Sequence, residues 1–176
     1  MMTSMEQVLP PDTASGAGFE GTRVRQFTVF LENRVGRLMA LLRALEEARQ
    51  KLYALAIEES ADAALVRLIV SDPEEAKPFL KAKGFSLSVT EVLCVELPKE
   101  LKNPLQAVCQ CLLAAELNLH YTYPMIQGLN GSAVVIYSDD ATFAARQLIK
   151  RRFRIISEGD LHVPASDDEG CDDATA

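Results

Sequence analysis

Residues 32–38, ENRVGRL, form the stretch whose residue types are best suited to bind a small ligand. The amide of Asn33 can donate and accept hydrogen bonds, and Gly36 allows a ligand to approach the backbone closely. Free N–H groups at the start of the expected helix attract a carboxylate, because the helix dipole is positive there. The alternative is structural: Asn33 caps the helix and Gly36 relieves crowding. The stretch therefore predicts either a carboxylate-binding loop or an ordinary helix start.

A second candidate is the aromatic pair Tyr121 and Tyr123 in the segment HYTYP. Alternate side chains of a strand point to the same face, so the two tyrosines share one face and His120 lies on the other. Each tyrosine could line a pocket with an apolar ring and a hydroxyl group. Aromatic residues also favour strands for packing alone, so an ordinary sheet position is the alternative. We expect a structural role for His120, because no carboxylate or nucleophile stands beside it in the sequence.

The sequence offers little for catalysis or metal binding. The four cysteines show no CxxC or Cys/His ligand spacing, and the chain has only two histidines. Cys109 and Cys111 stand two residues apart on one expected helix, so they do not face each other as a redox pair. The sequence also shows no nucleophile–base pair and no phosphate-binding loop. We therefore expect no catalytic residue, no metal and no cofactor.

The formal net charge of -7 arises at the C-terminal end of the chain. No Lys or Arg follows Arg154, whereas seven acidic residues do, which leaves 18 of the 25 acids against all 18 bases in residues 1–157. A neutral body of this kind argues against nucleic acid as a partner. The expected third strand of each unit also lacks the basic and aromatic pattern of RNA-recognition domains.

Neither end of the chain has the pattern of a folded or membrane-bound segment. Residues 1–22 are rich in Pro, Gly, Ser and Thr without periodicity, and residues 162–176 are similar and acidic, so we expect two disordered tails. The sequence has no run of about 18 apolar residues and no signal-peptide pattern at its start. We therefore expect a cytoplasmic protein without membrane contact.

Between these tails the hydrophobic pattern predicts the order strand, helix, strand, strand, helix, strand twice over. The first unit spans residues 23–91, with expected strands at 24–31, 52–57, 65–70 and 85–91 and helices at 35–48 and 73–83. The second unit spans residues 92–161, with expected strands at 92–97, 119–126, 133–137 and 153–157 and helices at 104–117 and 141–151. Asp72 and Gly84 mark the start and end of one helix, and Pro78 predicts an irregular turn inside it.

Equivalent residues of the two units are 67 positions apart. This offset relates Leu38 to Leu105, and it also relates Leu52 to Leu119. A constant offset at the same place in the element order indicates a duplicated unit. The order βαββαβ places two helices on one face of an antiparallel sheet. We therefore predict an α+β protein made of two tandem ferredoxin-like units.

Several of these segments resemble the ACT domain family. They are ENRVGRLMALLRAL, KLYALAIEE and ALVRLIVSDPEEAKPFLKAKGFSLSVTEVLCVEL in the first unit, and LHYTY in the second. The family motif after the first strand is an Asn followed shortly by Pro-Gly-x-Leu. Asn33, Gly36 and Leu38 match this motif, and Val35 takes the place of the proline. The resemblance covers residues 24–161 and points to small stand-alone proteins made of two tandem ACT units.

The resemblance implies that a small amino acid binds between ACT units, against the loop that follows a first strand. Carried over to the first unit, the ligand-binding residues are Asn33, Val35, Gly36, Arg37 and Leu38. In the second unit the corresponding residues are Asn103 and Leu105, with Tyr121 and Tyr123 completing the pocket. The second loop departs from the motif, because Pro104 has no N–H and no glycine is present. We therefore expect one complete pocket per chain, formed at the first loop.

The resemblance also implies a regulatory role without catalysis. The chain would form a homodimer through its ACT units. It would regulate an enzyme of amino-acid biosynthesis in trans, because no catalytic domain is fused to the two units in these 176 residues. The regulatory subunit of acetolactate synthase is one such context. The alternatives are a scaffold or interaction protein without a ligand and an enzyme of amino-acid metabolism. Fold alone does not separate these alternatives.

Overall fold

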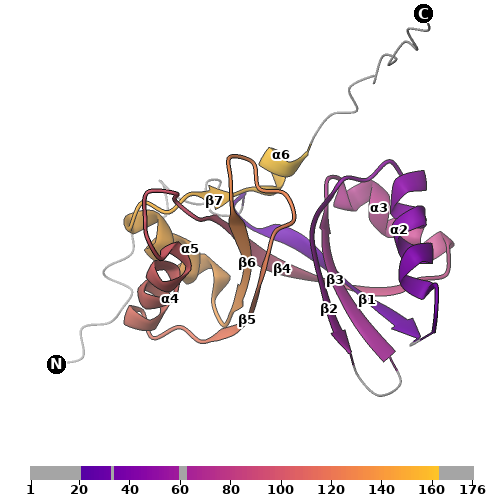
Figure 1. Ribbon diagram of the computed structural model, residues 1–176, viewed down its shortest axis with the longest axis horizontal. Coiled ribbons are helices and arrows are strands. Elements are labelled where there is room, and N and C mark those ends of the chain that lie inside the picture. Colours follow the sequence, from indigo (N-terminus) through magenta and orange to yellow (C-terminus); the bar gives the residue numbers. More distant parts are fainter. Residues whose placement is uncertain (1–20, 33, 60–62, 163–176) are drawn as a thin grey trace, which may run out of the picture.

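The computed structural model describes residues 21–32, 34–59 and 63–162, whose strands form a curled antiparallel sheet with helices on its outer sides (Figure 1). The first unit has the strand order β2-β3-β1-β4. Its strands are β1 (Val24–Glu32), β2 (Leu52–Glu59), β3 (Ala63–Val70) and β4 (Ser86–Glu96). Its helices are α2 (Arg37–Glu47) and α3 (Pro73–Ala82).

The second unit repeats this arrangement. Its strand order is β7-β4-β6-β5, so the fourth, first, third and second strands follow one another as in the first unit. The new elements are α4 (Pro104–Ala114), β5 (Leu119–Pro124), β6 (Ala133–Ser138), α5 (Ala141–Lys150), β7 (Ile155–Ile156) and the short helix α6 (Glu158–Leu161). The predicted α+β class with two tandem βαββαβ units is confirmed.

A single long strand, β4, belongs to both units. Residues 86–92 of this strand pair with β1, and residues 93–96 pair with β6. β7 pairs with the same second half at Cys94 and Val95. The sequence predicted two strands here, one for each unit, and the boundary expected after Glu91 falls inside β4. The two units are therefore joined by a continuous strand rather than by a loop.

The described residues pack into three hydrophobic clusters. The first lies between the sheet and the helices of the first unit and includes Phe27, Leu41, Leu68 and Leu80. The second is its counterpart in the second unit and includes Leu93, Leu112, Ile136 and Leu148. The third lies between the two units and includes Tyr53, Ile69, Cys94, Tyr123, Ile156 and Leu161. Because buried apolar surface is the main stabilising term in folding, the contact between the units is a core in its own right.

The curled sheet brings its two edge strands together at one point. Ala54 of β2 forms an isolated antiparallel bridge with Met125, which lies directly after β5. Beside this bridge, the N–H of Ile126 donates a hydrogen bond of 2.8 Å to the carbonyl oxygen of Tyr53. The units are thus connected through backbone hydrogen bonds both at β4 and at the opposite edges of the sheet.

Backbone irregularities recur at the spacing that the sequence indicated. The pairing of β2 with β3 has a register shift at Tyr53. The pairing of β5 with β6 has a register shift at His120, 67 residues later. Arg49 and Glu116 have the same spacing, and both adopt left-handed backbone angles, with φ of 53° and 56°. Left-handed non-glycine residues are uncommon, so their recurrence supports the predicted duplication.

The capping residues predicted for α3 are confirmed. The side chain of Asp72 accepts a hydrogen bond of 3.1 Å from the N–H of Glu75, as an N-cap residue does. Gly84, with φ of 85°, follows the helix in the left-handed conformation that a C-terminal glycine allows. The structure assigns one helix across Pro78, where the sequence predicted an irregular turn.

Candidate ligand-binding site

The loop before α2 was the leading candidate in the sequence. Gly36 is the N-cap residue of α2 and has φ of 86°. A Cβ atom added there would have no other atom within 4 Å, so the glycine is favoured by its backbone conformation and not by crowding. The carbonyl oxygen of Gly36 accepts a hydrogen bond of 2.9 Å from the N–H of Ala40. The alternative prediction, that Gly36 relieves crowding, is therefore wrong.

The other predicted residues of this first loop lie apart from one another. Val35 is fully exposed, and Leu38 is half-buried against the core of the first unit. The guanidinium of Arg37 lies 5.7 Å from the centre of the Phe85 ring. Asn33 lies outside the described residues. Three hollows in the described part of the chain are lined by other residues, and none of Val35, Gly36, Arg37 and Leu38 lines any of these three.

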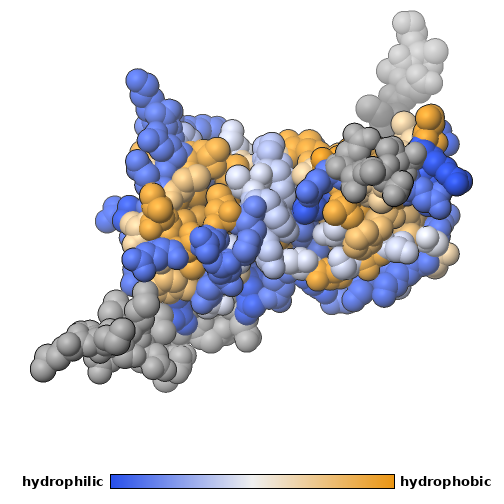
Figure 2. Space-filling model, turned by 90° about the horizontal axis from the view of Figure 1, so that it is seen from below, coloured by the Kyte–Doolittle hydropathy of each residue, from blue (hydrophilic) through white to orange (hydrophobic). Residues whose placement is uncertain are grey.

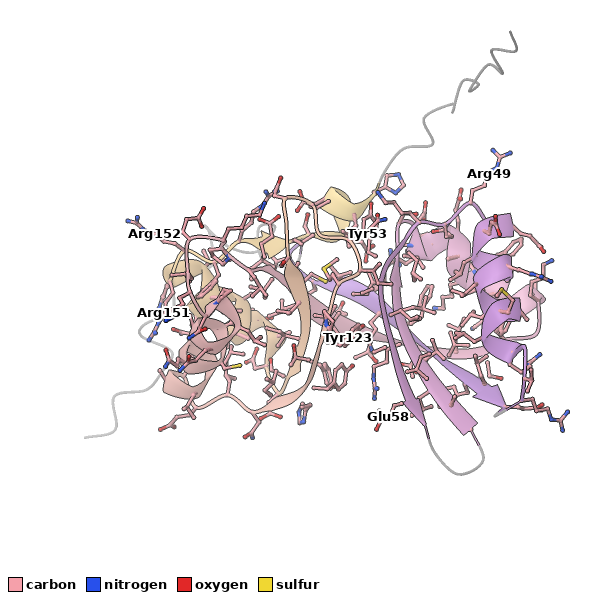
Figure 3. All side chains as sticks on the ribbon, in the orientation of Figure 1. Arg49, Tyr53, Glu58, Tyr123, Arg151 and Arg152 are labelled. Atoms are coloured by element: carbon pink, nitrogen blue, oxygen red, sulfur yellow. The ribbon has the colours of Figure 1, made fainter. Side chains whose placement is uncertain are left out.

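Tyr121 and Tyr123 point into the space between the two units, where Figure 3 shows Tyr123 opposite the strands of the first unit. The buried amide of Gln26, on β1, binds both hydroxyl groups. Its Nε2 donates to the Tyr121 hydroxyl at 2.9 Å, and its Oε1 accepts from the Tyr123 hydroxyl at 2.8 Å. Burial raises the pKa of Tyr123 well above its ordinary value, so this hydroxyl remains a donor at neutral pH.

An arginine from the first unit extends this group of polar residues. The guanidinium of Arg67, on β3, lies 4.4 Å from the centre of the Tyr121 ring and forms an ion pair of 2.6 Å with Glu58. Tyr121 also stacks on Tyr137, with ring centres 5.0 Å apart. The aromatic residues of the second unit therefore contact polar side chains of the first.

The largest hollow among these three lies in the second unit and has a volume of about 730 Å³. It is bordered by the segment after β4, the start of α4, the end of β5 and the loop before β6. Its walls are mostly apolar and include Leu97, Leu105, Tyr123, Met125, Ile126 and Val134. Of the predicted residues, Leu105 and Tyr123 therefore meet here, whereas Asn103 and Tyr121 do not line it.

A smaller hollow of about 390 Å³ adjoins the first. The two hollows share Leu97, Lys99, Gly131 and Ser132. The loop between β5 and β6 borders both hollows and depends on its glycines. A Cβ atom at Gly128 would lie 1.8 Å from the carbonyl oxygen of Gly131, a distance that atoms do not tolerate.

The start of α4 faces the larger hollow through Leu105. Pro104 occupies the first helical position, which suits a residue without an N–H. Asn103 is the N-cap residue but makes no capping hydrogen bond with its side chain among the described residues. The first turn of a helix has N–H groups without partners inside the helix, and the dipole there favours a negative charge. The second loop therefore offers a helix start beside a hollow, although it lacks the glycine of the first loop.

A family model described as an ACT domain pair matches residues 22–163 of the chain. The chain belongs to this family. A solved structure of a protein from Bacteroides thetaiotaomicron has 30% sequence identity, covers 80% of this chain and 96% of its own, and has a TM-score of 0.72. The ligand-free regulatory subunit of aspartate kinase from Thermus thermophilus has 13% identity, covers 73% and 91%, and has a TM-score of 0.51, which shows the shared fold. A comparison with curated proteins finds no match.

Among the described residues of this ACT domain pair, His120 and Asp139 contact each other. Nε2 of His120 lies 2.6 Å from Oδ1 of Asp139 on the surface. The sequence did not predict this carboxylate neighbour, because the two residues are far apart in the chain. Hydrogen bonds from Asn118 and the nearby His120 hold the pKa of Asp139 below its ordinary value. In the described ranges, no three or more His, Cys, Asp or Glu side chains form a metal-binding group, and no helix is long and apolar enough to cross a membrane.

Sequence reasoning missed three residues of the ACT domain pair that matter for its site and its packing. They are Gln26, Lys99 and Glu158. Gln26 and Glu158 have their partners 95 and 133 residues away in the chain, on the other unit. Lys99 lies at the boundary of the two hollows. The segment QGLNGS, whose closely spaced glycines are typical of tight backbone contacts, was the signal for this part of the site.

Proposed function

We propose that this ACT domain pair is a non-catalytic regulatory protein that binds a small amino acid and passes its occupancy to a partner enzyme in trans. The hollow beside the start of α4 is the observation that carries the proposal, because it joins an apolar volume to a helix start. The fold it shares with a protein named as the regulatory subunit of aspartate kinase supports the regulatory role.

The proposed site lies at the second loop, whereas the sequence favoured the first. The second loop has no glycine, but its helix start borders the larger hollow through Leu105. Tyr123 lines the same hollow and also bonds Gln26 of the first unit at 2.8 Å. A ligand that moves Tyr123 would therefore alter the packing between the units. A regulatory change requires such a ligand to interact differently with the two packing arrangements.

We further propose that the chain forms a homodimer through α4. This helix carries Leu105 and Leu113 on its exposed side, with 41% and 75% of their surface exposed. Figure 2 shows hydrophobic residues gathered over the second unit, on its left, with hydrophilic residues around them. β5 is also the edge strand of the second unit, and an exposed strand edge favours pairing with a second copy.

The dimer is tested by light scattering at several protein concentrations. We expect the mass of a dimer for the parent chain and of a monomer for Leu113→Glu, because a charge in an apolar interface stays unpaired. Lys77→Glu, an exposed change on α3, is the matched control and should remain dimeric. A monomeric parent chain, or a dimeric Leu113→Glu variant, would contradict this arrangement.

The regulatory proposal is tested by thermal unfolding of the full chain with each of the twenty amino acids at millimolar concentration. Binding to the folded state alone stabilises a protein by about 2.7 kcal/mol at 100 times the dissociation constant, which raises Tm by several degrees. We expect such a rise for at least one amino acid. If none of the twenty changes Tm, the alternative of a scaffold or interaction protein without a ligand is favoured instead.

A further inference from the structure

Lys99 lies at the boundary of two hollows. It lines both the larger and the smaller hollow. Within the part of the chain that the structure describes, its ammonium has no hydrogen-bond or ion-pair partner. A protein ammonium in this position is available to an anionic group of a ligand.

Gly131 allows the Lys99 side chain to occupy this boundary. A Cβ atom added at Gly131 would lie 2.8 Å from Cε of Lys99 and 3.5 Å from its Nζ. The lysine side chain therefore lies directly against the glycine backbone. Any larger residue at position 131 would push the end of this side chain away.

The charges around the two hollows differ. Lys99 is the one charged side chain that lines the larger hollow. The smaller hollow adds Arg152, Arg154, Glu96 and Glu100. Glu96 already accepts a hydrogen bond of 2.9 Å from Asn130 and lies 3.6 Å from Arg154. The boundary at Lys99 thus has an apolar volume on one side and, on the other, two cations and two anions that balance each other, so Lys99 supplies the excess positive charge.

We propose, on the basis of the proposed function, that the ligand is an amino acid with an apolar side chain whose carboxylate pairs with Lys99. The apolar side chain lies in the larger hollow, where contact with walls such as Leu105 and Val134 removes it from water. With the ligand carboxylate on Lys99, an acidic side chain would lose its hydration in this hollow without a second cation to pair with. Lys99 and the apolar walls together determine specificity.

The ligand class is tested by calorimetric titration of the full-length chain. The ligands are L-leucine, L-phenylalanine, L-serine and L-aspartate, together with 3-methylbutylamine, which has the leucine side chain and amine but no carboxylate. We expect leucine or phenylalanine to bind at least about tenfold more tightly than serine and aspartate, because burying a large apolar side chain provides that difference. We expect no measurable binding of the amine. Equal or tighter binding of serine or aspartate would overturn the proposal.

The role of Lys99 is tested with matched variants and the best ligand of this series. We expect Lys99→Gln to weaken binding about two- to fivefold, as loss of a partly exposed ion pair does, and Lys99→Arg to retain it. Gly131→Ala should weaken binding similarly by displacing the lysine side chain. Lys102→Gln, an exposed change in the same loop that lines neither hollow, should bind like the parent chain.

The outcomes separate this inference from the proposed function. If an amino acid binds but Lys99→Gln keeps the parent affinity, the chain remains an amino-acid sensor and the role of Lys99 is refuted. If only polar amino acids bind, the apolar class is refuted in the same way. If no amino acid binds at millimolar concentration, both the proposed function and the ligand class fail.

Discussion

Gln26 occupies the centre of the contact between the two ACT units. It is completely buried, yet its amide has a donor and an acceptor partner in Tyr121 and Tyr123. A buried amide destabilises a protein unless its hydrogen bonds are formed, so this position favours the one arrangement of the units that supplies both hydroxyl groups. The tyrosines that the sequence singled out as pocket residues thus also fix how the units pack.

The Tyr123→Phe substitution tests this arrangement. It leaves the aromatic ring in place but removes the hydroxyl that donates to Oε1 of Gln26 at 2.8 Å. We expect the free energy of unfolding, measured by urea denaturation, to fall by about 1–2 kcal/mol, because a buried acceptor loses its partner. Tyr137→Phe is the matched control. Its hydroxyl has no hydrogen bond among the described residues, so its effect should stay within about 0.5 kcal/mol. Equal effects of both changes would contradict the assigned role of Gln26.

At the scale of elements, α6 connects the end of the second unit to the first. Leu161 is completely buried in the cluster between the units, and its carbonyl oxygen accepts a hydrogen bond of 2.9 Å from the hydroxyl of Tyr53. Nε of Arg25, on β1, donates to the two carboxylate oxygens of Glu158 at 3.0 and 3.1 Å. Arg25 also pairs with Glu74 at the start of α3. A four-residue helix therefore contacts two elements of the first unit.

The ion pair between Arg25 and Glu158 predicts a dependence of stability on pH. Burial alone would raise the pKa of Glu158, but hydrogen bonds and the charge of Arg25 outweigh it and hold this pKa below its ordinary value. A carboxyl group with a lowered pKa stabilises the fold fully above the unfolded pKa of about 4.3, and this contribution is lost as the pH falls through the folded pKa.

We expect Glu158→Gln to lower the free energy of unfolding by about 1 kcal/mol at pH 7. The difference from the parent chain should shrink as the pH falls below about 4, because protonation then removes the same interaction. Urea denaturation between pH 7 and pH 3 measures both. Glu46→Gln, on the exposed side of α2, is the control and should follow the parent curve. A difference that stays constant down to pH 3 would show that the Glu158 charge does not act through Arg25.

The sequence predicted elements well where the signal was local. Asp72 and Gly84 mark the limits of α3, and the repeat offset holds for the bulges and left-handed residues. Prediction from the sequence failed where the decisive contact joins residues that are distant in the chain. β4 was predicted as two strands because nothing in its residues shows that β1 and β6 pair with different halves of it. α6 was missed because four residues are too few for a periodic pattern.

The candidate site was less predictable than the fold for the same reason. Leu105 and Tyr123 were expected to bind a ligand, and both line the larger hollow, but Lys99 and the loop glycines were not expected there. A motif identifies a backbone conformation, as at Gly36, whereas a hollow depends on several elements that meet in space. Val35 is an example: it occupies a position of the motif, yet its side chain is fully exposed and lines no hollow that the structure describes here.

At the scale of the whole molecule, we expect the two units to unfold together. They share β4, the bridge between Ala54 and Met125, and a buried cluster with residues from both units. Two domains joined by a flexible linker would have no such common core and would unfold independently. Cooperation between the units is also what a regulatory protein needs if occupancy at one loop is to be detected elsewhere.

Hydrogen exchange of the Leu148→Ala variant tests this cooperation. Leu148 is completely buried in the core of the second unit, so its truncation should cost about 2–3 kcal/mol. If the units unfold together, the slowest amides of β3, in the first unit, should exchange about 30- to 150-fold faster, by the same factor as those of β6. Unchanged β3 amides beside faster β6 amides would mean that the units open separately. A bound ligand should have the opposite effect on these exchange rates. An amino acid held at Lys99 should slow exchange of the β3 amides, because stabilising one unit then stabilises both.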